Sequence, residues 1–141
     1  MQTDEGAAGM RRRISTGSDY EKLVGYSRAL VVGDWVFVSG TTGRDHVTGE
    51  IPTDVVDQVH LIFRTINWAL TEAGSSFADV VRGRIIMTDA ADDARVAPVI
   101  GQYLKPVGPA LTSCVAQLLD PRLKIEIDVT ALKGSGEAAG R

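Results

Sequence analysis

The sequence predicts an α+β domain in which a mixed β-sheet carries two helices packed on one face. Three observations lead to this prediction: the order of the elements, one long stretch with helical periodicity, and one strand with strict alternation. The order is a hairpin, a helix, a strand, a second helix and two further strands. Strands with one apolar face, interspersed with amphipathic helices, form a sheet covered by helices on that face.

The predicted hairpin consists of residues 29–32 and 35–38, two short runs rich in β-branched and aromatic residues. Gly33 and Asp34 separate the two runs. Glycine adopts positive φ at little steric cost, so this pair predicts a two-residue turn between antiparallel strands.

One long stretch has apolar residues at helical spacing over about five turns. These residues are Val55, Val59, Ile62, Ile66, Ala69, Leu70 and Ala73. We expect Thr53 to be the N-cap of this helix and Gly74 its C-cap. A second helix is predicted over residues 91–104, although Pro98 and Gly101 interrupt its pattern.

Three further strands are predicted over residues 80–87, 111–118 and 123–132. The last one alternates most strictly, with apolar residues at odd positions and polar residues at even positions. Such alternation turns one face of a strand toward the helices and leaves the other face partly polar.

The chain has 141 residues, which fits a single domain over residues 12–133. Residues 1–11 and 134–141 are rich in glycine and alanine without periodicity, and we expect them to be disordered. The arginines at 11–13 are expected to be a solvated tail that enters the first strand at Ile14, and residues 20–24 to lead into the hairpin.

Composition excludes several classes of function. A net charge of −3 provides no basic field for nucleic acid, so a nucleic-acid partner is not expected. No apolar run has the roughly 20 residues that span a bilayer, and no signal peptide is evident, so we expect no membrane association and a cytoplasmic protein. The two histidines and one cysteine lie far apart, and His60 has no second ligand nearby, so neither a metal nor a cofactor is expected.

Several short motifs identify a family. Gly-Tyr-Ser-Arg-Ala at residues 25–29, Val-Gly-Asp at 32–34 and Val-Ser-Gly at 38–40 resemble the opening of the RidA family, also called YjgF or L-PSP endoribonuclease-like. Later elements agree in order and spacing over residues 12–133. The resemblance implies a chorismate-mutase-like fold and a homotrimer with small-molecule clefts between subunits.

The resemblance also implies a site. The run Lys-Ile-Glu-Ile at residues 124–127 is similar to the family's run on the last strand, so Glu126 is expected to orient or activate the water that attacks an imine carbon. Tyr26 matches the cleft tyrosine, and Ser39 with Gly40 matches the backbone wall. From the residues alone, the favoured interpretation of Glu126 is a solvated carboxylate on an open sheet face, and Tyr26 can be a rim aromatic that packs against the hairpin.

One departure separates this chain from the active members of the family. Those enzymes carry an arginine after Pro-Ala, where it clamps the substrate carboxylate, whereas this chain has Leu111. Leu111, Thr112 and Ser113 are still expected to border the ligand, with backbone N–H groups holding it. The family often has cysteine at position 113, and the neighbouring Cys114 is expected to be a small buried hydrophobe on the opposite face.

Arg84 is a candidate replacement for that arginine. It lies on the same strand face as Arg82, and it would receive an anion if this face lines the cleft. The alternative is a surface or intersubunit salt bridge.

These residues support two main hypotheses. The first is a RidA-like trimer that binds a small metabolite and hydrolyses an enamine or imine, with weak or no activity on 2-iminopropanoate. The second is a non-catalytic ligand-binding or regulatory trimer. Endoribonuclease activity, to which the family name refers, is disfavoured by the acidic pI of about 5.3.

Overall fold

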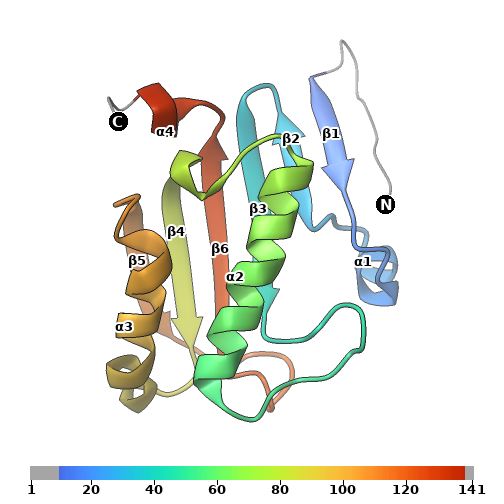
Figure 1. The fold of residues 1–141 in the computed structure, drawn as a ribbon. Helices are drawn as coiled ribbons and strands as arrows, with labels where there is room; N and C mark the ends of the chain where they lie inside the picture. Colours follow the sequence, from blue (N-terminus) through green and yellow to red (C-terminus); the bar gives the residue numbers. More distant parts are fainter. Residues whose placement is uncertain (1–9, 139–141) are drawn as a thin grey trace.

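Two helices pack across one face of a six-stranded sheet in the computed structural model, which describes residues 10–138 (Figure 1). The strands are β1 (Arg11–Ile14), β2 (Ala29–Val32), β3 (Trp35–Thr42), β4 (Val80–Met87), β5 (Ala110–Val115) and β6 (Ile125–Leu132). The helices are α1 (Asp19–Val24), α2 (Val55–Glu72), α3 (Asp93–Leu104) and α4 (Ser135–Ala138), with 3-10 turns at Phe77–Asp79 and Ala90–Asp92. The predicted fold class is confirmed.

The sheet has the strand order β1-β2-β3-β6-β4-β5, which places the last strand of the chain in the middle. All neighbours are antiparallel except β4 and β5, so the sheet is mixed. β6 was predicted to be amphipathic, and its odd-numbered residues from Ile125 to Ala131 are buried while its even-numbered residues are half-buried. The polar face of this central strand therefore lies away from the helices.

The register of β3 against β6 contains a bulge. Val38 pairs with Val129, but the next pair is Thr41 with Ile127. Between these two pairs β3 therefore contains one residue more than β6. Ser39 and Gly40 lie within this irregular stretch. A bulge bends the strand and redirects the side chains beside it.

α2 supplies much of the core through an apolar stripe that includes Phe63, Ile62 and Ile66, all fully buried. Its N-cap is Asp54 rather than the predicted Thr53, because the Asp54 carboxylate accepts a hydrogen bond from the Val56 N–H at 2.8 Å. The C-cap is Ala73 rather than the predicted Gly74, which directly follows the cap and has a φ of 80°.

Residues 20–24, which we expected to lead into the hairpin, form most of helix α1. Ser18 caps the helix by accepting a hydrogen bond from the Glu21 N–H, and Gly25 ends it with a φ of 89°. The helix escaped prediction because it is short and has no apolar stripe: Leu23 is 83% exposed. Local capping, rather than burial of one face, therefore accounts for it.

Both ends of the domain are more structured than expected. β1 begins at Arg11 rather than Ile14, because Arg11 pairs with Val32 of β2, and the Arg12 guanidinium donates to the Glu72 carbonyl oxygen at 3.2 Å. After Gly134 the chain forms α4 instead of a disordered tail, and the Asp79 carboxylate accepts from the Gly136 N–H. Residues 1–9 and 139–141 lie outside the described residues.

One predicted burial was wrong. Cys114 is exposed, and all six residues of β5 are exposed with it. β5 is an edge strand, so it has a neighbour on only one side. The prediction for Cys114 assumed that both faces of the strand were covered, and the chain by itself does not cover them.

Candidate functional site

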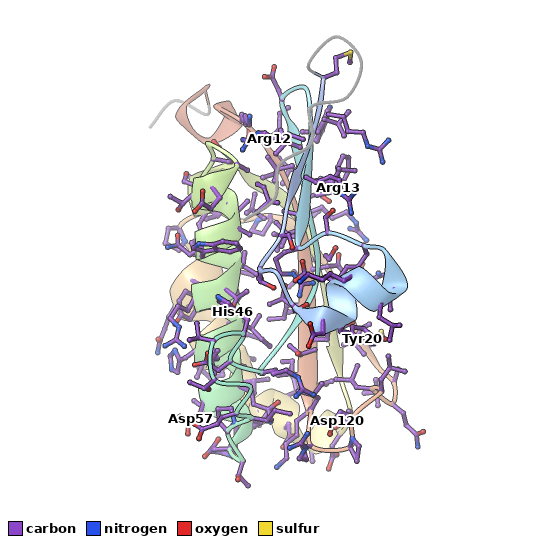
Figure 2. The ribbon with its side chains drawn as sticks, turned by 90° about the vertical axis from the view of Figure 1, so that its right-hand side faces the viewer. Arg12, Arg13, Tyr20, His46, Asp57 and Asp120 are labelled. Atoms are coloured by element: carbon purple, nitrogen blue, oxygen red, sulfur yellow. The ribbon has the colours of Figure 1, made fainter. Side chains whose placement is uncertain are left out.

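A cavity of about 960 Å³ opens beside the polar face of β6. Its walls come from α1, the loop after β3, the loop between β5 and β6, and the facing residues of β3 and β6. Figure 2 shows the sheet nearly edge-on, with α2 to its left and α1 in front and to the right. Tyr20, His46 and Asp120, labelled there, each come from a different wall of the cavity.

Glu126 lies on the wall of this cavity, as do Tyr26 and Gly40. The Glu126 carboxylate packs against the backbone of Gly40: a Cβ added to that glycine would lie 2.8 Å from Oε2. No side chain larger than hydrogen fits there without displacing the carboxylate. Because Gly40 has no side chain, the carboxylate can lie against its backbone, which is consistent with the predicted backbone wall.

The Glu126 carboxyl has a raised pKa. Burial is the main cause, since it disfavours the charged form, and the neighbouring Asp128 acts in the same direction. Arg28 and Arg84 oppose the shift. A carboxylate whose pKa lies closer to neutral pH is a better proton acceptor, which suits general acid–base chemistry.

Arg28 is the residue that the sequence reasoning missed. It belongs to the Gly-Tyr-Ser-Arg-Ala motif, from which the sequence predicts only Tyr26 as a site residue. Its Nη2 atom donates to the Gly40 carbonyl oxygen at 2.6 Å, and its guanidinium carbon lies 5.6 Å from the centre of the Tyr26 ring. Arg28 therefore connects the tyrosine to the glycine, and it lines the cavity with both.

Tyr26 is half-buried and stacks edge-on with Tyr20, their ring centres 6.0 Å apart. Burial raises the pKa of its hydroxyl, and Arg28 partly counteracts the shift. The hydroxyl is therefore protonated at neutral pH, so it can donate a hydrogen bond to a ligand.

Ser39 has a structural contact in this chain. Its hydroxyl donates to the Ser27 carbonyl oxygen at 2.7 Å, and its N–H donates to the Arg28 carbonyl oxygen at 3.0 Å. Both bonds join β3 to the segment that carries Tyr26 and Arg28. Ser39 thus holds the motif in place. It does not itself line the cavity, whereas its neighbour Gly40 does.

Buried polar contacts fix the α1 side of the cavity. Glu21 is 3% exposed, and its carboxylate accepts from the Ser15 hydroxyl at 2.7 Å and from the Thr16 hydroxyl. On the opposite rim, Asp120 accepts from Arg122 at 2.7 Å and from Arg44 at 3.1 Å, and these bonds hold its pKa well below the usual range.

Leu111 and Ser113 lie elsewhere. They line a separate hollow of about 310 Å³ between β5 and α3, together with Ile85 and Met87 of β4. A Cβ on Gly83 would lie 3.0 Å from the Leu111 Cδ1 atom, which also places Leu111 on the helix side of the sheet. Within one chain, the structure does not bring Leu111 and Ser113 together with Glu126.

Arg84 and Thr112 lie on the open face, the sheet face turned away from α2 and α3. The Arg84 guanidinium pairs with Asp128 at 3.0 Å, and Arg82 donates to the Thr112 hydroxyl at 2.9 Å. Arg84 is therefore already engaged in an exposed ion pair, as the alternative interpretation expected. It does not line the cavity that contains Glu126.

Residues 10–138 contain neither a cluster of side chains suited to hold a metal ion nor a helix suited to cross a membrane. No group of three or more histidine, cysteine, aspartate or glutamate side chains is arranged to hold a metal ion. None of the helices described there combines the length and hydropathy needed to cross a membrane.

Comparisons with known proteins agree with this geometry. A family model described as endoribonuclease L-PSP matches residues 16–133. A 2-iminobutanoate/2-iminopropanoate deaminase from Capra hircus is 29% identical over 126 residues, which cover 89% of this chain and 92% of that protein.

Solved structures give the same result. A Mycobacterium tuberculosis protein of the YjgF/YER057c/UK114 family superposes with a TM-score of 0.79 and 36% identity, covering 86% of this chain and 98% of that one. Escherichia coli TdcF with bound serine gives a TM-score of 0.72 and 29% identity, covering 77% and 87%. The fold, the family model and these relatives together show that the chain belongs to the endoribonuclease L-PSP family, which is also named YjgF or RidA.

Proposed function

We propose that this protein binds a small metabolite in the cavity beside β6 and hydrolyses an enamine or imine to a carbonyl compound and ammonia. One observation carries the proposal: a half-buried glutamate with a raised pKa lies on the wall of a cavity large enough for a small molecule. The similarity to 2-iminobutanoate/2-iminopropanoate deaminases supports the choice of reaction.

Glu126 acts on water in this proposal. The carboxylate accepts a proton as the water oxygen bonds to the imine carbon, and the C=N double bond becomes a single bond. The carboxyl then returns this proton to nitrogen, which gives a carbinolamine. The carboxylate next takes the hydroxyl proton and passes it to nitrogen, the C–N bond breaks to release ammonia, and the C=O bond forms. One water is consumed for each ammonia released, and no cofactor takes part.

The surroundings of Glu126 suit this task. Gly40 lets the carboxylate lie against the backbone, which fixes its position. Tyr26 provides a protonated hydroxyl in the same cavity. Burial keeps the carboxyl pKa above its ordinary value, so the proton transfers in both directions are more closely balanced.

We further propose a homotrimer in which the edge strand β5 borders the cavity of the neighbouring subunit. Supporting this, all of β5 is exposed in the isolated chain, and the aromatic residues Trp35 and Phe37 are 43% and 45% exposed on the open face. In such a trimer Leu111, Thr112 and Ser113 complete the cleft from the partner's side. Light scattering tests this: a mass near 15.1 kDa would contradict it.

The test of the function is ammonia release from a panel of imines, some with a carboxylate and some neutral. We expect the wild type to release ammonia from at least one imine and Glu126→Gln to release it at least about 100-fold more slowly. Ligand binding without ammonia release from any imine would instead favour a non-catalytic ligand-binding trimer. Cleavage of labelled RNA that Glu126→Gln abolishes would favour the endoribonuclease hypothesis.

A further inference from the structure

Gln58 is a buried polar residue that the proposed reaction does not yet use. It lies on α2, its side chain is fully buried, and it does not line the cavity. Its Nε2 atom donates to the carbonyl oxygens of Pro52 at 2.8 Å and Arg122 at 2.9 Å, and its Oε1 atom accepts from the Lys124 N–H at 2.9 Å. Two partners are acceptors and one is a donor, so only one orientation of the amide satisfies all three. A buried polar side chain that is fully bonded in this way holds its neighbours in a single arrangement.

These bonds join α2 to two loops, the β3–α2 loop (residues 43–54) and the β5–β6 loop (residues 116–124). Pro52 belongs to the first loop, and the other two partners belong to the second. Both loops lie at the lower end of the sheet in Figure 1, and both contribute residues to the cavity wall. One side chain outside the cavity thus holds two of its walls.

The β3–α2 loop is held by Gln58 near both of its ends. At its start, a Cβ added to Gly43 would lie 2.5 Å from the Gln58 Cβ atom and 2.9 Å from its Cα atom. No side chain fits there unless the backbone shifts, so β3 can meet α2 this closely only because residue 43 is glycine. Near its end, the loop is held by the hydrogen bond from Gln58 to Pro52. The loop therefore leaves from and returns to one residue, which limits the movement of the part that lines the cavity.

The β5–β6 loop carries the restraint to Glu126. Lys124 is the last residue before β6, and Glu126 is the second residue of that strand. The Lys124 N–H is held by Gln58, and the Lys124 carbonyl oxygen accepts from the Thr88 N–H at 3.0 Å. Because both of its main-chain polar groups are bonded, Lys124 fixes the point at which β6 begins, and thereby the position of Glu126.

An ion pair also joins the two loops, but it is the weaker link. Arg44 and Asp120 lie 3.1 Å apart, and both side chains are partly exposed. Asp120 is bonded to Arg122 at 2.7 Å as well, so it keeps a partner when Arg44 moves away. Exposed ion pairs contribute little to stability. We therefore expect the buried Gln58, rather than this pair, to set the separation of the loops.

We propose that Gln58 is a positioning residue, which fixes the two cavity loops and the start of β6, and through them the place of the Glu126 carboxylate. It acts through the main chain of Lys124 and takes no part in the chemistry itself. Its effect on catalysis rests on the proposed function, whereas its effect on geometry can be measured without a substrate. A catalytic group has to be held within a fraction of an ångström, so loss of this support should lower kcat more than it raises KM.

Gln58→Met tests the proposal, because methionine has a similar length but no amide. We expect faster hydrogen exchange over residues 43–54 and at the Lys124 N–H. In an NMR titration, the pKa of the Glu126 carboxyl should move from its raised value toward its ordinary one, because the carboxyl becomes more exposed. In the ammonia-release assay, kcat should fall about 10-fold while KM changes less than about threefold.

Asp79→Ala is the matched control. Asp79 is also buried and also holds the main chain, since its carboxylate accepts from the Ser75 hydroxyl at 2.8 Å and from the Gly136 N–H at 3.1 Å. It does not line the cavity, and α4, to which it is bonded, lies at the upper end of the sheet in Figure 1. We expect Asp79→Ala to lower Tm but to leave loop exchange, the Glu126 pKa and kcat unchanged. Equal losses of kcat in both folded variants would mean that stability alone is responsible, and the proposal would be overturned.

Two further measurements guard against a folding failure of Gln58→Met. Gly43→Ala disturbs the same contact from the side of the loop and leaves the amide intact, so we expect faster exchange at the same N–H groups. In the wild type, the Lys124 N–H should exchange at least about 100-fold more slowly than in an unfolded peptide, although it lies outside β6. Unprotected exchange at Lys124 in the wild type would overturn the proposal, and so would folded variants at 43 and 58 that keep wild-type exchange.

Failure of this inference and failure of the proposed function give different results. If no imine is hydrolysed but Gln58→Met moves the Glu126 pKa and speeds loop exchange, the positioning role stands and the catalytic proposal is wrong. If the wild type hydrolyses an imine and a folded Gln58→Met protein keeps its kcat and its loop exchange, the function stands and the role of Gln58 is wrong.

Discussion

The cavity beside β6 and the hollow between β5 and α3 differ in chemistry. The cavity beside β6 has charged residues on its wall, notably Glu126 and Arg28, whereas the hollow between β5 and α3 is lined mainly by apolar side chains such as Leu111 and Ile85. A carboxylate and a cation can do acid–base chemistry and hold an anion, and an apolar hollow cannot. In the proposed trimer, the first region would therefore carry the chemistry and the second only the shape of the cleft.

Of the variants that test this comparison, Glu126→Gln should have the largest effect on activity. Glutamine keeps the size of the side chain but cannot accept a proton, so we expect imine hydrolysis to fall at least about 100-fold. Ammonia release under saturating substrate measures it. Asp128→Asn, two residues along the same strand face, is the comparison variant: it removes only the secondary cause of the raised Glu126 pKa and leaves the carboxylate in place, so activity should fall far less than in Glu126→Gln. Equal losses in both variants would mean that the open face as a whole, rather than Glu126, is required.

Gly40→Ala should have the second-largest effect on activity. The added methyl would lie 2.8 Å from the Glu126 Oε2 atom, so the carboxylate must move. Displacement of a catalytic group by about 1 Å costs up to about 100-fold, and we expect a loss of about 10- to 100-fold in kcat/KM.

Gly101→Ala provides a matched comparison. Its added Cβ would lie 3.3 Å from the Cε atom of the flexible Lys105 side chain, within helix α3. Alanine is the better helix former, so this variant should keep full activity and unfold at the same or a higher temperature. A fully active Gly40→Ala enzyme would show that Glu126 does not need its observed position.

The raised pKa of Glu126 predicts a measurable effect on stability. The folded state holds this proton more tightly than the unfolded chain, so the favourable contribution is present below the ordinary pKa of 4.5 and is lost as pH rises through the folded-state value. At neutral pH the ionised carboxylate therefore destabilises the fold. Glu126→Gln should have a higher Tm than the wild type at pH 7, and the difference should shrink as pH falls below 4.5. A Tm difference that does not depend on pH would contradict this account.

The smallest effects should come from the apolar hollow. Leu111 is 44% exposed in the isolated chain, so Leu111→Ala should cost about 1 kcal/mol of unfolding free energy or less. We expect KM to change a few-fold and kcat to stay nearly constant. A loss of activity as large as that of Glu126→Gln would show that β5 contributes directly to the chemistry.

Much of the fold could be predicted because the signals are periodic. The spacing of apolar residues in α2 and the alternation in β6 each identify a covered face, and the sheet follows from them. α1 gave no such signal, because Ser18 and Gly25 define it through hydrogen bonds and backbone conformation. Cys114 was misplaced because the exposure of an edge strand depends on strand order, which residue patterns do not contain.

The candidate site, like the fold, could be predicted from the sequence only in part. Glu126, Tyr26 and Gly40 could be identified from their motifs, and the structure places them on one cavity. Arg28 could not be identified, because its importance comes from contacts between residues far apart in sequence and from a buried donor without an acceptor. A sequence motif names the residues but does not show which of them lacks a partner.

The bulge in β3 has a consequence for how this strand can vary in length. Because Ser39 and Gly40 together occupy the place of one residue between Val38 and Thr41, Thr41 turns toward the core, at 1% exposure, and Gly40 faces Glu126. Deleting either Ser39 or Gly40 would restore a regular ladder and leave Thr41 facing the core. Loss of Ser39 would remove the hydrogen bonds to the Ser27 and Arg28 carbonyl oxygens, whereas loss of Gly40 would place the Ser39 side chain against the Glu126 carboxylate. Either deletion therefore damages the site while leaving the strand intact.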